Sequence, residues 1–159
     1  GVLLLLLGTL KRHADDANVI AAAFKALRYL LQGSSTAIGT FVSRGGPQQV
    51  LTLLDKHRES VVTLAWGCGT IKAAAWDLAG RNAFAGANAV PLILNLLETN
   101  AYEVSVVVEA FIALRNLSLV PSVKAFLQKR RDIIDVCIEM YSDNAAVRTE
   151  ATSLLQNLA

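Results

Sequence analysis

The residues best suited to hold a ligand are two asparagines, Asn116 and Asn157, which occupy the same place in two similar segments. A side-chain amide carries donors and an acceptor, so a row of asparagines can bond both the amide and the carbonyl groups of an extended peptide. A second interpretation is that these asparagines stabilise the end of their own helix, as asparagine often does near turns. Both interpretations predict that Asn116 and Asn157 have the same role, each in its own repeat.

Two glutamates accompany these asparagines. Glu109 and Glu150 each precede one asparagine by seven residues, which places each pair on one face of a helix. Two glutamates in register favour a basic peptide, whereas a solvated helix face is the commoner meaning of an isolated glutamate.

Residue types that serve metal binding or catalysis are few and scattered. His13 and His57 have no Cys, Asp or Glu at metal-ligand spacing, so we expect surface histidines and no metal. Cys68 has no histidine nearby that could act as a base, and for both Cys68 and Cys137 we expect buried thiols. The sequence therefore predicts a protein that is not an enzyme and that needs no cofactor.

Phosphate binding is also poorly supported. The segment 67–72 lacks the glycine immediately before Lys-Ser/Thr that a phosphate loop requires. The basic cluster Lys129–Arg131, with Lys124 nearby, and the smaller cluster Lys11–His13 lie at expected turns between helices, where they favour solubility. A net charge of +2 gives no broad electrostatic footprint for nucleic acid.

Composition limits the class of protein. Of the 159 residues 53% are hydrophobic and 15 basic residues face 13 acidic ones, which excludes a disordered segment. The apolar run 2–7 is too short to cross a bilayer, so we expect no membrane anchor, and its start does not resemble a signal peptide. Because the chain begins and stops inside helical patterns, we expect a segment of a longer protein. Two distant cysteines fit a reducing compartment, which is the cytosol or the nucleus.

The elements that position these residues repeat with a period near 40 residues. The segments 26–31, 113–118 and 154–159 each end a helix whose apolar positions recur at four, seven, eight and eleven residues. A second helix precedes each of them, and in two copies it begins at a proline, Pro47 or Pro91. Each unit is therefore predicted to contain a short helix, a middle helix and a longer last helix.

The second copy is irregular and leaves two registers open. Its last helix can end at Leu78, which aligns 74–79 with the other helix ends, or it can begin at Val61 and end near Lys72. Gly67 and Gly69 predict a break or a close helix contact inside that helix. The nearby Trp66 and Trp76 are expected in the core, although a tryptophan facing a groove would be a good anchor for a partner.

These features resemble the armadillo repeat family, through Gly45-Gly46-Pro47, Val90-Pro91, and the helix ends 113–118 and 155–159. The resemblance covers the whole chain. It implies an all-α fold, a right-handed α-solenoid of three-helix repeats, in one domain 1–159 with approximate repeats 1–32, 33–79, 80–118 and 119–159. Stacking is also what physics requires, because one such unit cannot bury its faces alone.

The resemblance further implies a concave groove lined by the last helices, where asparagines near the helix ends hold the backbone of an extended peptide. The position of Asn116 and Asn157 is Tyr29 in the first repeat and, on one register, Asp77 in the second. A groove that receives nuclear localisation signals also has a Trp four residues before each Asn, where this chain has Ile112 and Ser153. The groove residues expected from the sequence are Asn116, Asn157, Glu109, Glu150, Ile112, Ser153, Arg115, Tyr29 and Lys25, with Arg28 beside them.

The function expected from the sequence is a scaffold that binds a protein partner through an extended segment in this groove. The alternative is a structural solenoid that stacks on its own parent chain or on a second copy, because residues Leu3 to Leu7 would have an uncovered apolar face.

Overall fold

The computed structural model describes all 159 residues, which form eleven α-helices and no strand. In chain order the helices are α1 (Val2–Arg12), α2 (Ala17–Leu31), α3 (Ser35–Ser43), α4 (Gly46–Lys56), α5 (Val61–Ala75), α6 (Leu78–Gly86), α7 (Ala89–Thr99), α8 (Val104–Leu117), α9 (Pro121–Lys129), α10 (Arg131–Met140) and α11 (Ala145–Leu158).

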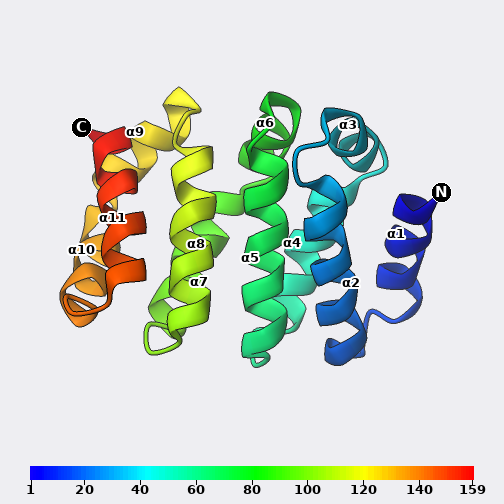
Figure 1. Cartoon of the computed structure of the whole chain (residues 1–159), viewed down its shortest axis with the longest axis horizontal. Helices are drawn as coiled ribbons and strands as arrows, with labels where there is room; N and C mark the ends of the chain where they lie inside the picture. The colour runs from blue at the N-terminus through cyan, green and yellow to red at the C-terminus, as the bar shows by residue number, and fades with distance from the viewer.

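The helices recur as a short helix, a middle helix and a longer last helix. The short helices are α3, α6 and α9, the middle helices are α1, α4, α7 and α10, and the last helices are α2, α5, α8 and α11. Each last helix packs on the next, and Figure 1 shows these four helices side by side with the short helices along one edge. This repeat-like all-α arrangement is compatible with an α-solenoid.

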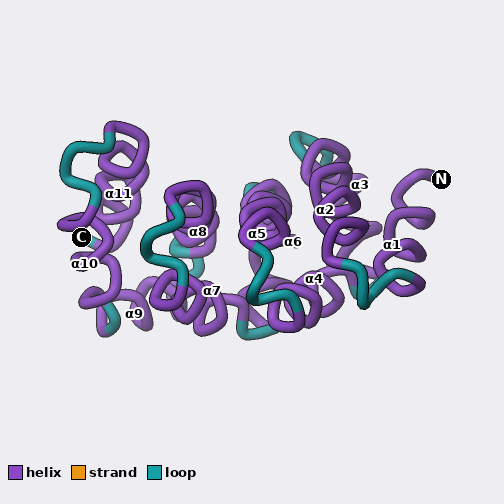
Figure 2. The backbone as a smooth tube through the Cα atoms, turned by 90° about the horizontal axis from the view of Figure 1, so that it is seen from below, coloured by secondary structure: helices purple, strands orange, loops and turns teal.

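The last helices and the middle helices form two layers (Figure 2). Both ends of the molecule bend toward the layer of last helices, so these helices line the concave side. None of the eleven helices is both long enough and apolar enough to form a membrane span.

One continuous hydrophobic core fills the space between the layers. Its largest side chains, Phe24, Phe41, Phe84 and Phe111, are completely buried. Both thiols are buried as predicted, and burial raises the pKa of Cys68 to about 12, so this thiol stays protonated at neutral pH.

The structure resolves the register of the second repeat. Helix α5 begins at Val61, where the Ser60 hydroxyl accepts a hydrogen bond from the Thr63 amide, and it ends at Ala75. Asp77 is the N-cap of α6 and accepts a hydrogen bond from the Ala79 amide. The alignment of 74–79 with the other helix ends is therefore wrong, and Asp77 is not the counterpart of the asparagines.

Helix α5 runs through its two glycines without a break. A Cβ atom on Gly67 would lie 2.3 Å from Leu54 Cδ2 of α4 and 3.1 Å from Phe24 Cε2 of α2. Of the two predictions for these glycines, the close helix contact is confirmed, because the glycine lets neighbouring helices approach α5 more closely than a side chain would allow.

Candidate functional site

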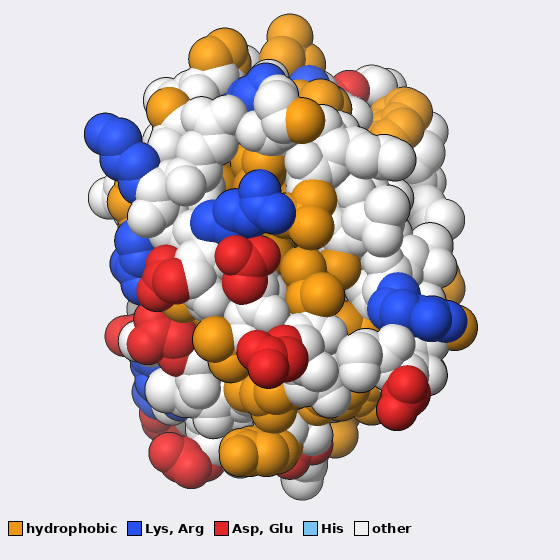
Figure 3. Space-filling view, turned by 90° about the vertical axis from the view of Figure 1, so that its left-hand side faces the viewer, with side chains coloured by type: hydrophobic (Ala, Val, Ile, Leu, Met, Phe, Trp, Pro, Cys, Tyr) orange, Lys and Arg blue, Asp and Glu red, His pale blue; other side chains and the backbone are white.

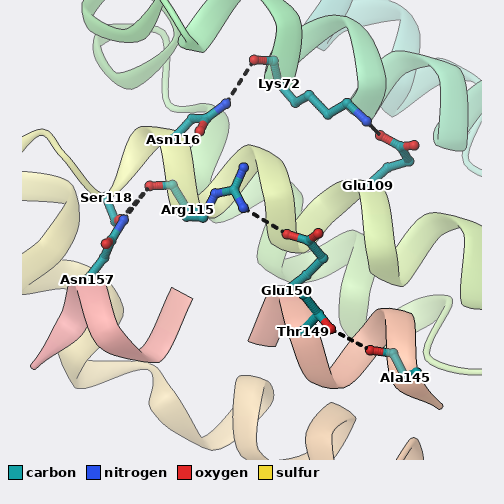
Figure 4. A network of polar contacts seen from close by, with 9 residues as sticks. All are labelled: Lys72, Glu109, Arg115, Asn116, Ser118, Ala145, Thr149, Glu150 and Asn157. Atoms are coloured by element: carbon teal, nitrogen blue, oxygen red, sulfur yellow. Dashed lines mark hydrogen bonds and ion pairs between the residues drawn. The ribbon is translucent and has the colours of Figure 1, made fainter. Parts of the chain in front are cut away.

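Asn116 completes the end of the preceding repeat. Its Nδ2 donates a hydrogen bond to the carbonyl oxygen of Lys72 at 3.0 Å (Figure 4). Lys72 lies in the last turn of α5, where carbonyl groups have no amide partner within their own helix. Asn116 on α8 therefore caps α5.

Asn157 repeats this contact one unit later. Its Nδ2 donates to the Arg115 carbonyl at 3.1 Å and lies 3.2 Å from Ser118 Oγ. The Ser118 hydroxyl also donates to the Arg115 carbonyl at 2.6 Å. Neither interpretation made from the sequence described this arrangement, in which each asparagine stabilises the end of its neighbour's helix rather than its own.

The two glutamates pair with the same two residues. Lys72 Nζ lies 2.6 Å from Glu109 Oε2, and Arg115 Nη1 donates to Glu150 Oε2 at 2.9 Å. All four side chains are half-buried, with Lys72 and Glu109 only 18% and 24% exposed. We call each group an inter-repeat clamp: Lys72 with Glu109 and Asn116, and Arg115 with Glu150 and Asn157.

The first junction lacks a clamp. Arg28 follows its N-cap residue by twelve positions, as Lys72 and Arg115 follow theirs, but the residues that face it are Trp66 in place of the glutamate and Ala73 in place of the asparagine. The Arg28 guanidinium lies 5.6 Å from the centroid of the Trp66 ring and 5.1 Å from that of Tyr29. A cation–π contact therefore replaces the ion pair here.

Gly69 lies between Arg28 and Glu109. A Cβ atom on Gly69 would be 3.0 Å from Arg28 Cδ and 3.5 Å from Glu109 Oε2. The Arg28 Nε atom is buried and has no hydrogen-bond partner. The absence of a side chain at Gly69 thus lets the arginine of α2 lie across the surface of α5.

Two cavities open on the last helices. The first, of about 560 Å³, is mostly apolar and lies between α5, α8 and the start of α11. Its lining includes Val62, Ala65, Trp66, Val104, Val108 and Glu109. We call it the apolar cavity.

The second cavity, of about 520 Å³, lies near the ends of α2, α5 and α8. Its lining includes Arg28, Lys72, Trp76, Ile112, Arg115 and Asn116, and no acidic side chain. We call it the basic cavity. The walls of the two cavities are in contact, since Arg28 and Lys72 of the basic cavity contact Trp66 and Glu109 of the apolar cavity.

The remaining residues expected in the groove lie on the same face but do not form one site. The Lys25 ammonium is 5.3 Å from the Trp66 ring centroid, and the Tyr29 and Trp66 rings are 6.3 Å apart. Ser153 lies away from both cavities, in a shallow depression on α11 beside Arg148, Thr149 and Gln156.

Both tryptophans were expected in the core. Trp66 is half-buried, because it packs against the core and also forms part of the wall of the apolar cavity. The expectation is wrong for Trp76, which is 56% exposed at the basic cavity. Lys72 was also missed. Its position twelve residues after the N-cap, shared with Arg28 and Arg115, was a signal that depended on the unresolved register.

One histidine and two of the clustered arginines make contacts within the chain. His13 is exposed, whereas His57 is half-buried and its Nε2 donates to the Ala14 carbonyl at 2.7 Å, which corrects its expected surface position. Arg130 pairs with Glu98 and Asp132, and Arg131 pairs with Asp135.

Comparison with known proteins establishes similarity of fold alone. No known family profile matches the chain, and no curated protein is similar to it in sequence. The crystal structure of an engineered protein from the Northeast Structural Genomics Consortium is similar, with a TM-score of 0.83 and 20% identity. The alignment covers 99% of this chain and 62% of that one, so the chain spans about three fifths of the engineered protein's length.

Proposed function

We propose that the chain is a non-catalytic, armadillo-type module that binds an extended segment of a partner protein along α2, α5, α8 and α11. The observation that carries this proposal is the pair of adjoining cavities on the concave side. Concave, largely apolar sites with a few convergent polar groups are the usual form of a binding site.

The tryptophans support the same proposal. Trp76 is exposed beside the basic cavity and Trp66 forms a wall of the apolar cavity. Large aromatic side chains in such positions are the residue type that dominates binding energy at protein interfaces.

In this proposal the asparagines have two tasks. One N–H of Asn116 is engaged by the Lys72 carbonyl, and the amide oxygen and the second N–H are left to contact the backbone of the bound segment. The two unpaired thiols support the proposed location in the cytosol or the nucleus.

The experiment is a selection from a random peptide library displayed on phage, followed by fluorescence anisotropy with the selected peptide. Trp76→Ala is expected to weaken binding, and Val136→Ala on α10, outside the concave layer, is the control and should bind as the parent does. Failure to select any peptide, or equal loss in both variants, would reject the groove.

A second candidate function, self-association, is favoured by apolar side chains at both ends of the row. Val2 and Leu5 on α1 are 62% and 66% exposed, and Val136 on α10 is 54% exposed. Figure 3 shows hydrophobic side chains grouped on the end of the molecule formed by the C-terminal repeat. Sedimentation velocity tests this candidate, because Leu5→Asp and Val136→Asp should each reduce the assembly while leaving peptide binding unchanged.

A further inference from the structure

We propose that the groove prefers an acidic segment, which places a carboxylate in the basic cavity beside Arg28 and an apolar side chain in the apolar cavity. This inference rests on the proposed function and specifies its ligand. It differs from the basic peptide that the two glutamates favour in the sequence.

Both glutamates of the groove already form ion pairs within the chain. Glu109 is paired with Lys72 and Glu150 with Arg115, so each negative charge is already matched by a cation of the neighbouring repeat. A basic peptide would have to compete with these half-buried pairs. The two glutamates therefore do not form a free acidic surface.

Two cations beside the cavities have no carboxylate partner. Lys25 and Arg28, both on α2, form no ion pair with any carboxylate of the chain, and each makes a cation–π contact with the Trp66 ring. The basic cavity has Arg28, Lys72 and Arg115 in its lining and no acidic residue. Because Lys72 and Arg115 are already paired with Glu109 and Glu150, Arg28 is the unpaired cation of this cavity, and its charge is complementary to a carboxylate.

The Arg28 side chain is held in place by its neighbours. Its guanidinium contacts the neighbouring Tyr29 and Trp66 rings, and Gly69 provides the space in which its side chain lies. A guanidinium held against aromatic rings keeps in-plane N–H groups that match a carboxylate in a two-bond geometry. The Nε atom is buried against α5, so a carboxylate in the cavity would meet the terminal Nη groups of the guanidinium.

The apolar cavity favours a protein partner over a nucleic acid. The adjoining apolar cavity of about 560 Å³ suits a large aliphatic or aromatic side chain. The unpaired cations beside the two cavities, Lys25 and Arg28, are too few to follow a nucleic acid backbone, which requires an extended basic track. An acidic protein segment with a nearby hydrophobic residue uses both cavities.

The test begins with the peptides selected from the random library. The proposal predicts enrichment of Asp and Glu over the starting library, with a large apolar residue close by. Selection of basic or uncharged peptides would overturn this inference and leave the proposed function standing, whereas the absence of any selected peptide would overturn both.

Variants then locate the carboxylate. Arg28→Gln is expected to weaken binding of the selected acidic peptide about ten-fold or more and to lower its dependence on salt, because a charge-assisted hydrogen bond is lost. The charge-matched control is Arg44→Gln, which removes an exposed cation at the end of α3 and should change nothing. Equal effects of the two variants would overturn the assignment to Arg28.

A final arm tests nucleic acid directly. A labelled single-stranded oligothymidine is expected neither to bind at physiological salt nor to displace the acidic peptide. Displacement that disappears in Arg28→Gln would show that the cavity recognises phosphate and would overturn the proposal.

Discussion

The side-chain amide of Asn116 donates a hydrogen bond to the backbone carbonyl of Lys72, 44 residues earlier in the chain. Asn157 makes the same bond to Arg115, and the side chains of Lys72 and Arg115 pair with Glu109 and Glu150. Lys72 at the end of α5 and Arg115 at the end of α8 are thus each bound by the next repeat, through the backbone carbonyl and through the side chain.

Removal of the asparagine amides should lower stability unequally. Asn116→Ala is expected to destabilise the protein by about 1 kcal/mol, because the Lys72 carbonyl loses its side-chain donor. Asn157→Ala should cost less, since the Ser118 hydroxyl still donates to the Arg115 carbonyl. Urea denaturation measures both, with Gln156→Ala, an exposed amide on α11, as the control. Equal stability of Asn116→Ala and the parent would contradict the capping role.

The ion pairs should show measurable, salt-sensitive coupling. A double-mutant cycle of Lys72→Met and Glu109→Gln is expected to give about 0.5–1 kcal/mol at low ionic strength, as partly buried pairs do. The coupling should shrink in concentrated NaCl because salt screens charges. A matched cycle on the exposed pair Arg131 and Asp135 should give a smaller value, and a salt-independent result for Lys72 and Glu109 would argue against the ion pair.

Two glycines should respond in opposite directions to the same substitution. Gly67→Ala is expected to destabilise by about 1–3 kcal/mol, because the new methyl group would overlap Leu54. Gly39→Ala, within α3 and with nothing within 4 Å of the new atom, should stabilise by up to about 1 kcal/mol through helix propensity. Thermal unfolding followed by circular dichroism distinguishes them. A stabilised Gly67→Ala would mean that α4 does not approach α5 closely.

Stability should depend on the charge of Asp77. The Ser35 hydroxyl and the Ala79 amide donate to its carboxylate and lower the pKa of Asp77 below the ordinary value of 3.8. Because the folded pKa is the lower one, this contribution is present above pH 3.8 and is lost as the pH falls through the folded value. Asp77→Ala is therefore expected to be less stable than the parent at pH 7, and the difference should shrink under acid.

The control for this pH dependence is Asp143→Ala, which removes an exposed carboxylate at another helix connection. Urea denaturation of both variants and the parent between pH 7 and pH 3 measures the two differences. A difference for Asp77→Ala that changes no more with pH than that for Asp143→Ala would show that the carboxylate charge does not stabilise α6.

The sequence predicted much of the all-helical repeat arrangement because three of the four last helices, α2, α8 and α11, carry a regular apolar stripe. It left the register of α5 open because Gly67 and Gly69 suggest a break, whereas their neighbours Leu54, Phe24 and Arg28 come from other helices and appear only in three dimensions. The face shared by Glu109 and Asn116 was predictable from their spacing. Their partners were not, because pairing with Lys72 depends on how one repeat is stacked on another.

The clamps also determine when each repeat can be complete during synthesis. The Lys72 carbonyl in the last turn of α5 obtains its side-chain donor only when Asn116 has left the ribosome. The Arg115 carbonyl in the last turn of α8 depends on Asn157 in the same way. Folding on the ribosome should therefore run one repeat behind translation. The first repeat is the exception, because Arg28 packs on Trp66, which emerges well before the end of the second repeat.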